Sequence, residues 1–65
     1  MKEALIWEQG GITTILFTKT ILSIESDKIE NPNAKVGCKI SVDFLDEPIN
    51  CSKSIEEILR LLEIN

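Results

Sequence analysis

The chain has 65 residues, of which 43% are hydrophobic and 28% are charged. These values are ordinary for a globular protein, so we expect one domain over residues 1–65 and exclude a two-domain enzyme, a collagen-like chain and a disordered tail. Seven Lys and Arg residues against eleven Asp and Glu residues give a net charge of −4, which disfavours binding to nucleic-acid phosphates. No apolar run is long enough to cross a bilayer, and we expect no contact with a membrane.

The first predicted element is a β-hairpin of residues 4–8 and 12–19, because the intervening Gly10 and Gly11 allow the positive φ angles of a tight turn. Alternation along the two strands predicts two faces. One face would carry Leu5, Trp7, Thr13, Ile15 and Phe17. The opposite face would carry Ile6, Ile12 and Leu16. Trp7 is expected either to fill the core or to anchor an interface, since tryptophan is frequent at both kinds of position.

A third strand is predicted over residues 20–25, after a bend at residues 18–20, with Leu22 and Ile24 on the same side. The polar stretch of residues 26–35 contains Asn-Pro-Asn, which is typical of a loop.

The clearest strand signal covers residues 36–44, where apolar and polar residues alternate without interruption. A turn at residues 46–48 leads to a short strand over residues 48–51. Matching the apolar faces pairs Phe44 with Ile49 and Val42 with Cys51. In that register Cys38 lies roughly 13 Å along the strand from the residue opposite Cys51. A disulfide needs Cα atoms within about 7 Å, so we expect two reduced, buried thiols.

The C-terminal segment is predicted to be a helix, because Ser54 and Glu57 have the spacing of a capping box. The apolar stripe that would pack on the sheet consists of Ile55, Ile58, Leu59 and Leu62. Leu61 and Ile64 widen this stripe. The expected fold is therefore α+β, with a small antiparallel sheet of four to five strands and one C-terminal helix packed on it.

The residue types disfavour catalysis. The chain has no histidine and no tyrosine, so Cys38 and Cys51 have no imidazole base to activate them. The two thiols cannot hold zinc alone, and the acidic turns have no EF-hand spacing. We expect neither a catalytic residue, nor a metal site, nor a cofactor.

Apolar residues on both faces of the first hairpin predict self-association, because one helix covers only one face of a small sheet. The expected interface consists of Trp7, Ile12, Leu16, Leu61 and Ile64. We therefore predict a homo-oligomer that serves as a noncatalytic protein–protein interaction module. The lack of a secretory signal at the first residues favours the cytoplasm, and the excess of isoleucine over valine favours a bacterial or phage-encoded regulator or inhibitor.

Two alternatives remain open. The oligomer could bind or sequester a nucleotide or another anionic metabolite at the subunit interfaces. The expected contacts for that ligand are Thr13, Thr14, Thr18, Lys19, Thr20 and Lys39. An acidic inhibitor that mimics nucleic acid is the third possibility, and the modest net charge disfavours it.

The order of the predicted elements resembles that of the FlbD-like (SwrD) small flagellar proteins. The similar segments are the alternating strand at residues 39–44, the Ser-Ile-Glu-Glu-Ile helix start at residues 54–58, and the Leu-Ser-Ile-Glu strand at residues 22–25. The resemblance implies a role in flagellar motility without catalytic residues. The chain departs from the family where Asp46-Glu47-Pro48 replaces an Asn-Gly type of turn, and where the N-terminal Thr-Arg-Leu-Asn-Gly-like segment is missing.

Overall fold

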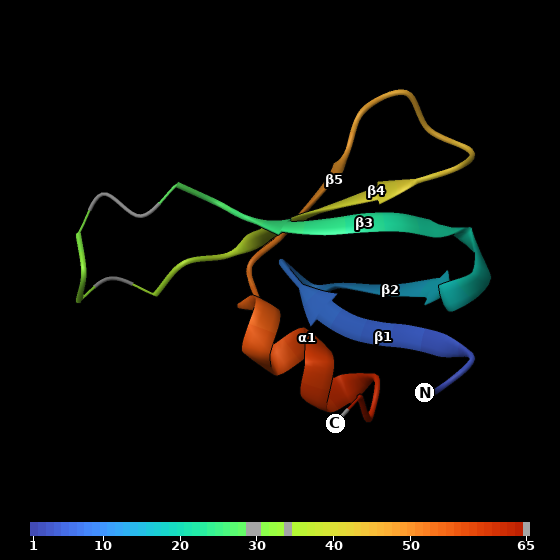
Figure 1. Ribbon diagram of the computed structural model, residues 1–65, viewed down its shortest axis with the longest axis horizontal. Coiled ribbons are helices and arrows are strands. Elements are labelled where there is room, and N and C mark those ends of the chain that lie inside the picture. Colours follow the sequence, from blue (N-terminus) through green and yellow to red (C-terminus); the bar gives the residue numbers. More distant parts are fainter. Residues whose placement is uncertain (29–30, 34, 65) are drawn as a thin grey trace.

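The computed structural model describes residues 1–28, 31–33 and 35–64, and within them it has an α+β architecture. In chain order the elements are β1 (Ala4–Gln9), β2 (Ile12–Phe17), the 3-10 turn η1 (Thr18–Thr20), β3 (Ile21–Ser26), β4 (Cys38–Val42), β5 (Ile49–Cys51) and α1 (Ile55–Leu61). The strands form two antiparallel sheets, β1-β2 and β3-β4-β5, with α1 beside them (Figure 1). The α+β class and the C-terminal helix are confirmed, but the prediction of a single sheet is wrong.

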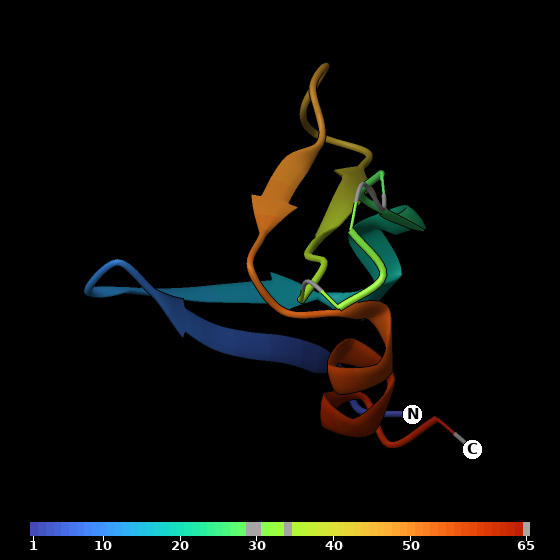
Figure 2. The same ribbon diagram turned by 90° about the vertical axis from the view of Figure 1, so that its left-hand side faces the viewer.

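The turn η1 separates the two sheets. The hydroxyl of Thr18 donates to the carbonyl oxygens of Lys2 and Glu3, at 3.1 and 3.0 Å. The hydroxyl of Thr20 donates to the carbonyl oxygen of Phe17 at 2.7 Å. These bonds hold the chain in a bend, so β3 leaves in a new direction instead of pairing with β2. Figure 2 shows the strands of the two sheets crossing steeply.

The Gly-Gly turn sets the register of the first hairpin. Gly10 and Gly11 have φ angles of 59° and 78°, as a two-residue type I′ turn requires, and the turn places Gln9 opposite Ile12. Counting back from that pair places Leu5 opposite Leu16 and Ile6 opposite Ile15. The predicted faces are therefore wrong. Leu5, Trp7 and Leu16 share the buried face, while Ile6, Ile15 and Phe17 share the exposed one.

A β-bulge changes the faces of β3. The register with β4 shifts between Ile21 and Ser23, so Leu22 is the extra residue. Ile21 lies opposite Val42 and Ile24 lies opposite Ile40, and both are half-buried, whereas Leu22 is 70% exposed. The prediction that Leu22 and Ile24 share a side is wrong for this reason.

The pairing of β4 with β5 also differs from the prediction. Ile40 lies opposite Ile49 and Cys38 lies opposite Cys51, a shift of four residues from the expected register. β4 ends at Val42, where the Asp43 amide donates to the Thr20 carbonyl oxygen at 2.9 Å, and the exposed residues 43–48 form a wide loop. Phe44, expected to point inward, is 60% exposed. The two cysteines are therefore direct neighbours across the sheet.

The core lies between the two sheets and α1. Its buried residues are Leu5, Trp7, Leu16, Cys38, Ile40, Val42, Cys51, Ile58 and Leu62. The predicted stripe is confirmed for Ile58 in α1 and for Leu62 at its C-cap, while Ile55 is half-buried and Leu59 is 38% exposed. None of the described helices is long and apolar enough to cross a membrane.

Both ends of α1 have capping motifs. The Ser54 hydroxyl accepts from the Glu57 amide at 3.2 Å, which confirms Ser54 as the N-cap. At the other end Glu63 adopts a φ of 58°, and the Ile64 amide donates to the Leu59 carbonyl oxygen at 3.0 Å. This arrangement is a Schellman motif, which ends the helix after two turns.

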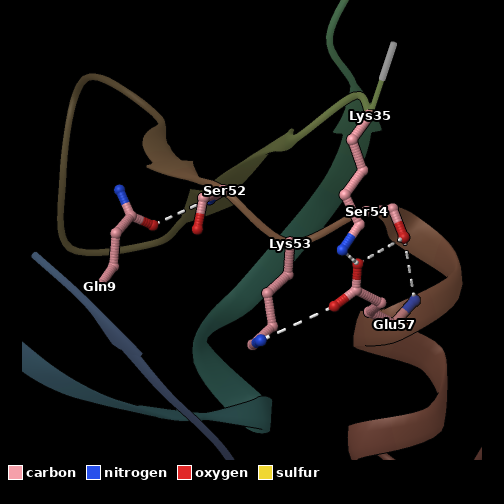
Figure 3. Close-up of polar contacts among 6 residues, drawn as sticks. All are labelled: Gln9, Lys35, Ser52, Lys53, Ser54 and Glu57. Atoms are coloured by element: carbon pink, nitrogen blue, oxygen red, sulfur yellow. Dashed lines mark hydrogen bonds and ion pairs between the residues drawn. The ribbon is translucent and has the colours of Figure 1, made fainter. Parts of the chain in front are cut away.

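Two hydrogen bonds join parts of the molecule that are distant in sequence. The Gln9 side-chain oxygen accepts from the Ser52 amide at 2.8 Å, which ties the first hairpin to the segment between β5 and α1 (Figure 3). The Lys2 amide donates to the Leu62 carbonyl oxygen at 2.9 Å and ties the start of the chain to the helix. Together with the core, they fix the first sheet against the rest of the fold.

Candidate functional site

An open cleft of about 670 Å³ lies beside the first turn of α1 and the segment that leads into β4. Its charged lining consists of Lys35, Glu56, Glu57 and Arg60, and Ser54 lines it from the helix N-cap. A volume of this size is in the range of small-molecule pockets. The cleft is therefore the first place to test for a ligand site.

Glu57 is the centre of the polar contacts in this cleft. Its carboxylate lies 3.3 Å from the Lys35 ammonium and 3.6 Å from the Lys53 ammonium, and it accepts from the Ser54 hydroxyl at 3.4 Å (Figure 3). The hydrogen bond from Lys35 lowers the pKa of Glu57 below its usual value, and the charges of Lys35 and Lys53 and the hydrogen bond at Ser54 add to the effect. The carboxylate is thus held ionised.

This lowered pKa predicts a pH dependence of stability. Because the folded state favours the carboxylate, the stabilisation is present above the unfolded-state value near 4.5 and is lost as pH falls through the lower folded-state pKa. Glu57→Gln is expected to lower the free energy of unfolding at pH 7 and to make no difference well below pH 4. Urea denaturation across this range measures the effect, with Glu56→Gln on the exposed side of the helix as the control. If Glu57→Gln lowered the free energy of unfolding equally at pH 7 and well below pH 4, the lowered pKa of Glu57 would be contradicted.

The charges in the cleft do not favour an anionic ligand. Lys35 and Arg60 are balanced there by Glu56 and Glu57, and the Lys35 ammonium is already paired. A bound anion would have to compete with the Glu57 carboxylate for the same cation. The cleft therefore gives no support to the binding of an anionic metabolite.

The structure does not gather the residues predicted to contact such a ligand. The six positions are spread over β2, η1 and β4, and they are Thr13, Thr14, Thr18, Lys19, Thr20 and Lys39. The hydroxyls of Thr18 and Thr20 are used within the fold, because they donate to backbone carbonyl oxygens. A recess of about 430 Å³ brings Thr18 and Lys19 together with Glu3 and Phe17. Its charges are also balanced, with one of each sign.

The second candidate site is an exposed apolar surface on the first hairpin, which we call the hairpin face. It consists of Ile6, Ile15 and Phe17, which are 53%, 56% and 58% exposed. Ile6 and Ile15 are direct partners across the two strands, and Phe17 follows two residues after Ile15 on the same side. The hairpin face is therefore one continuous apolar stripe.

The predicted interface residues separate into two groups. Trp7 and Leu16 are each only 4% exposed and pack in the core, so the assignment of Leu16 to an exposed face is wrong. Ile12, Leu61 and Ile64 are 68%, 38% and 41% exposed. The hairpin face itself was missed, although the two-residue Gly-Gly turn could have located it by fixing Leu5 opposite Leu16.

The two thiols are free and buried, on facing positions of β4 and β5. Burial raises the pKa of Cys38 to about 11, and the neighbouring Cys51 and Asp27 add to the effect. Cys38 is therefore protonated at neutral pH. Within the described residues, no three His, Cys, Asp or Glu side chains are grouped so that they could hold a metal ion.

These features define a small α+β protein with two antiparallel sheets, a balanced charged cleft and an exposed apolar face. No family model matches the chain, and no curated protein or solved structure matches it significantly. The resemblance to the FlbD-like family therefore stays a prediction.

Proposed function

We propose that this protein is a noncatalytic protein–protein interaction module that acts as a homo-oligomer, in its simplest form a two-fold dimer. In this proposal it is a small cytoplasmic regulator or inhibitor of bacterial or phage origin. The observation that carries the proposal is the hairpin face, where three large apolar side chains are more than half exposed on one side of a two-stranded sheet. Such a contiguous apolar surface is typical of an interface.

A second copy of the chain is the partner that suits this face. The directly opposed Ile6 and Ile15 lie near its middle, Glu8 lies toward the turn, and Lys19 follows the far end beside Phe17. Consider two hairpins stacked face to face, with a two-fold axis in the plane between them and perpendicular to their strands. It places Ile6 and Ile15 of the two copies against each other and brings Glu8 of each copy toward Lys19 of the other. In this arrangement apolar side chains would meet apolar side chains, and Glu8 and Lys19 would approach with opposite charges, as a two-fold interface requires.

Dimerisation through the hairpin face predicts that Ile15→Glu converts the dimer to a monomer. The substitution would bury an unpaired carboxylate at the centre of the interface, so we expect the dissociation constant to rise by about 100-fold or more. Native mass spectrometry and light scattering over a concentration series measure the dissociation constant.

The matched control is Leu22→Glu, which adds the same charge to an apolar residue that is 70% exposed on the other sheet. This variant should remain dimeric, and both variants should keep the far-ultraviolet circular dichroism of the folded chain. A monomeric parent protein at high concentration, or an Ile15→Glu variant that remains dimeric, would exclude the hairpin face as the interface.

The same mass spectra distinguish the alternative function. A protein that sequesters a nucleotide or metabolite would carry an added mass of a few hundred daltons per site when purified gently. Integer multiples of the chain mass alone would favour the interaction module.

A further inference from the structure

Cys38 and Cys51 form a cross-strand pair at one end of the β4-β5 ladder. They are direct partners in the antiparallel register, and they are 0% and 3% exposed. Residues directly opposite each other in an antiparallel pair project their side chains from the same face of the sheet. Both thiols therefore lie side by side in the core, and both are free.

The spacing of such a pair suits a disulfide. Directly opposed residues in antiparallel strands have Cα atoms about 4.5–5.5 Å apart. Disulfides join residues whose Cα atoms are usually about 4.4–6.8 Å apart. The pair thus lies within bonding range without a change in strand register.

We propose that Cys38 and Cys51 are a redox-responsive site, which a low-molecular-weight disulfide such as glutathione disulfide converts to an intramolecular disulfide and which reduced glutathione reopens. In the forward direction the Cys51 thiolate attacks one sulfur of glutathione disulfide. A mixed disulfide forms, and one glutathione leaves as its thiolate and takes up a proton. Opening of the edge exposes the Cys38 thiol to water, to which it loses its proton. The Cys38 thiolate then attacks the Cys51 sulfur, and the second glutathione leaves in the same way. Two protein thiols are oxidised, and one disulfide is reduced to two thiols.

The position of β5 explains how an oxidant reaches a buried pair. β5 has only three residues, it pairs only with β4 in the described sheet, and the exposed loop of residues 43–48 precedes it. Short edge elements of this kind open locally at a lower free energy than the centre of a fold. Cys51 lies on this edge strand and is therefore the first thiol to be exposed.

The disulfide would also affect the rest of the fold. Cys51 is followed by Ser52, whose amide binds Gln9, and by Ser54, which caps α1. A bond from Cys51 to β4 therefore fixes the strand from which both contacts continue. We expect the oxidised form to melt on the order of 10 °C higher than the reduced form, because the bond restricts the unfolded chain.

The experiment uses the unmodified chain in a series of glutathione redox buffers, followed by acid quenching and intact-mass measurement. The expected product is a monomeric chain lighter by about 2 Da, as two hydrogen atoms are lost. It should carry no glutathione, melt at a higher temperature and return to the starting mass with dithiothreitol. A chain that keeps two free thiols in glutathione disulfide, during native incubation and after unfolding and refolding, would refute the proposal. A product that retains glutathione, or a disulfide-linked dimer, would also refute it.

Two single variants test the order of the steps. Cys38→Ser should retain one glutathione on Cys51, because no second thiol is present to displace it. Cys51→Ser should react more slowly, because its remaining thiol lies on the central strand β4. Faster modification of Cys51→Ser would overturn the order of attack. The mass of the unmodified chain tests the disulfide itself even if either variant fails to fold.

Discussion

Replacing Leu16 with alanine is expected to lower the free energy of unfolding by about 2–5 kcal/mol, the usual cost of truncating a buried leucine. Leu16 is 4% exposed and lies directly opposite Leu5 on the core face of the first hairpin. A chain of this length has a total stability of about 3–10 kcal/mol. The loss is therefore a large fraction of the total stability, and thermal and urea denaturation followed by circular dichroism should show a clearly lower unfolding midpoint.

Ile15→Ala is the matched control for this prediction, since Ile15 is the adjacent residue on the opposite face and is 56% exposed. At low concentration, where the proposed dimer dissociates, Ile15→Ala should lower the free energy of unfolding by less than about 1 kcal/mol. A larger loss for Ile15→Ala than for Leu16→Ala would mean that the faces of the hairpin are reversed.

The second large effect is expected at Gly37, just before β4. A Cβ atom built on Gly37 would collide with the backbone carbonyl oxygen of Cys51, and backbone atoms cannot rotate away as a flexible side chain can. Gly37→Ala must therefore push β5 away from β4, which we expect to cost about 1–3 kcal/mol of stability. Denaturation curves measure the loss, and hydrogen exchange of the β5 amides shows where the opening occurs.

The control for Gly37 is Lys39→Ala on β4, because the side chain of Lys39 is exposed. This variant should change stability by no more than about 0.5 kcal/mol. If Gly37→Ala is equally neutral, the close approach of the two backbones at Cys51 is not a feature of the folded protein.

Alternation of residue types predicted much of the local structure. It did not predict the registers of the paired strands or which residues share a face of the first hairpin. The strand around Ile40 and the helix cap at Ser54 were both correctly located. A period of two, however, identifies only which side of a strand is apolar, and any even shift between β4 and β5 satisfies it. Pairing Cys51 with Val42 or with Cys38 therefore fits the pattern equally well. The bulge at Leu22 depends on contacts with β4 and leaves no signal in the local sequence.

The division into two sheets depends on contacts that sequence spacing does not reveal. The bonds from Thr18 to Lys2 and Glu3 span about fifteen residues and form only when the hairpin is already closed. The cleft also depends on a contact between residues distant in sequence, since Lys35 reaches Glu57 from another part of the chain. The capping role of Ser54 was predictable because its partner lies three residues away. The grouping of Ile6, Ile15 and Phe17 on one face was also predictable, because the turn type determines the register.

The separation of the sheets at η1 has a consequence for the order of folding. β1 and β2 are joined by a two-residue turn, and such a hairpin closes in about 1–10 μs. The Gln9–Ser52 and Lys2–Leu62 bonds connect residues 43 and 60 positions apart, so we expect them to form late in folding. Substitutions that remove these late contacts should accelerate unfolding and leave the folding rate nearly unchanged. The lifetime of the native chain is then set by the contacts that hold the first hairpin against the rest of the fold.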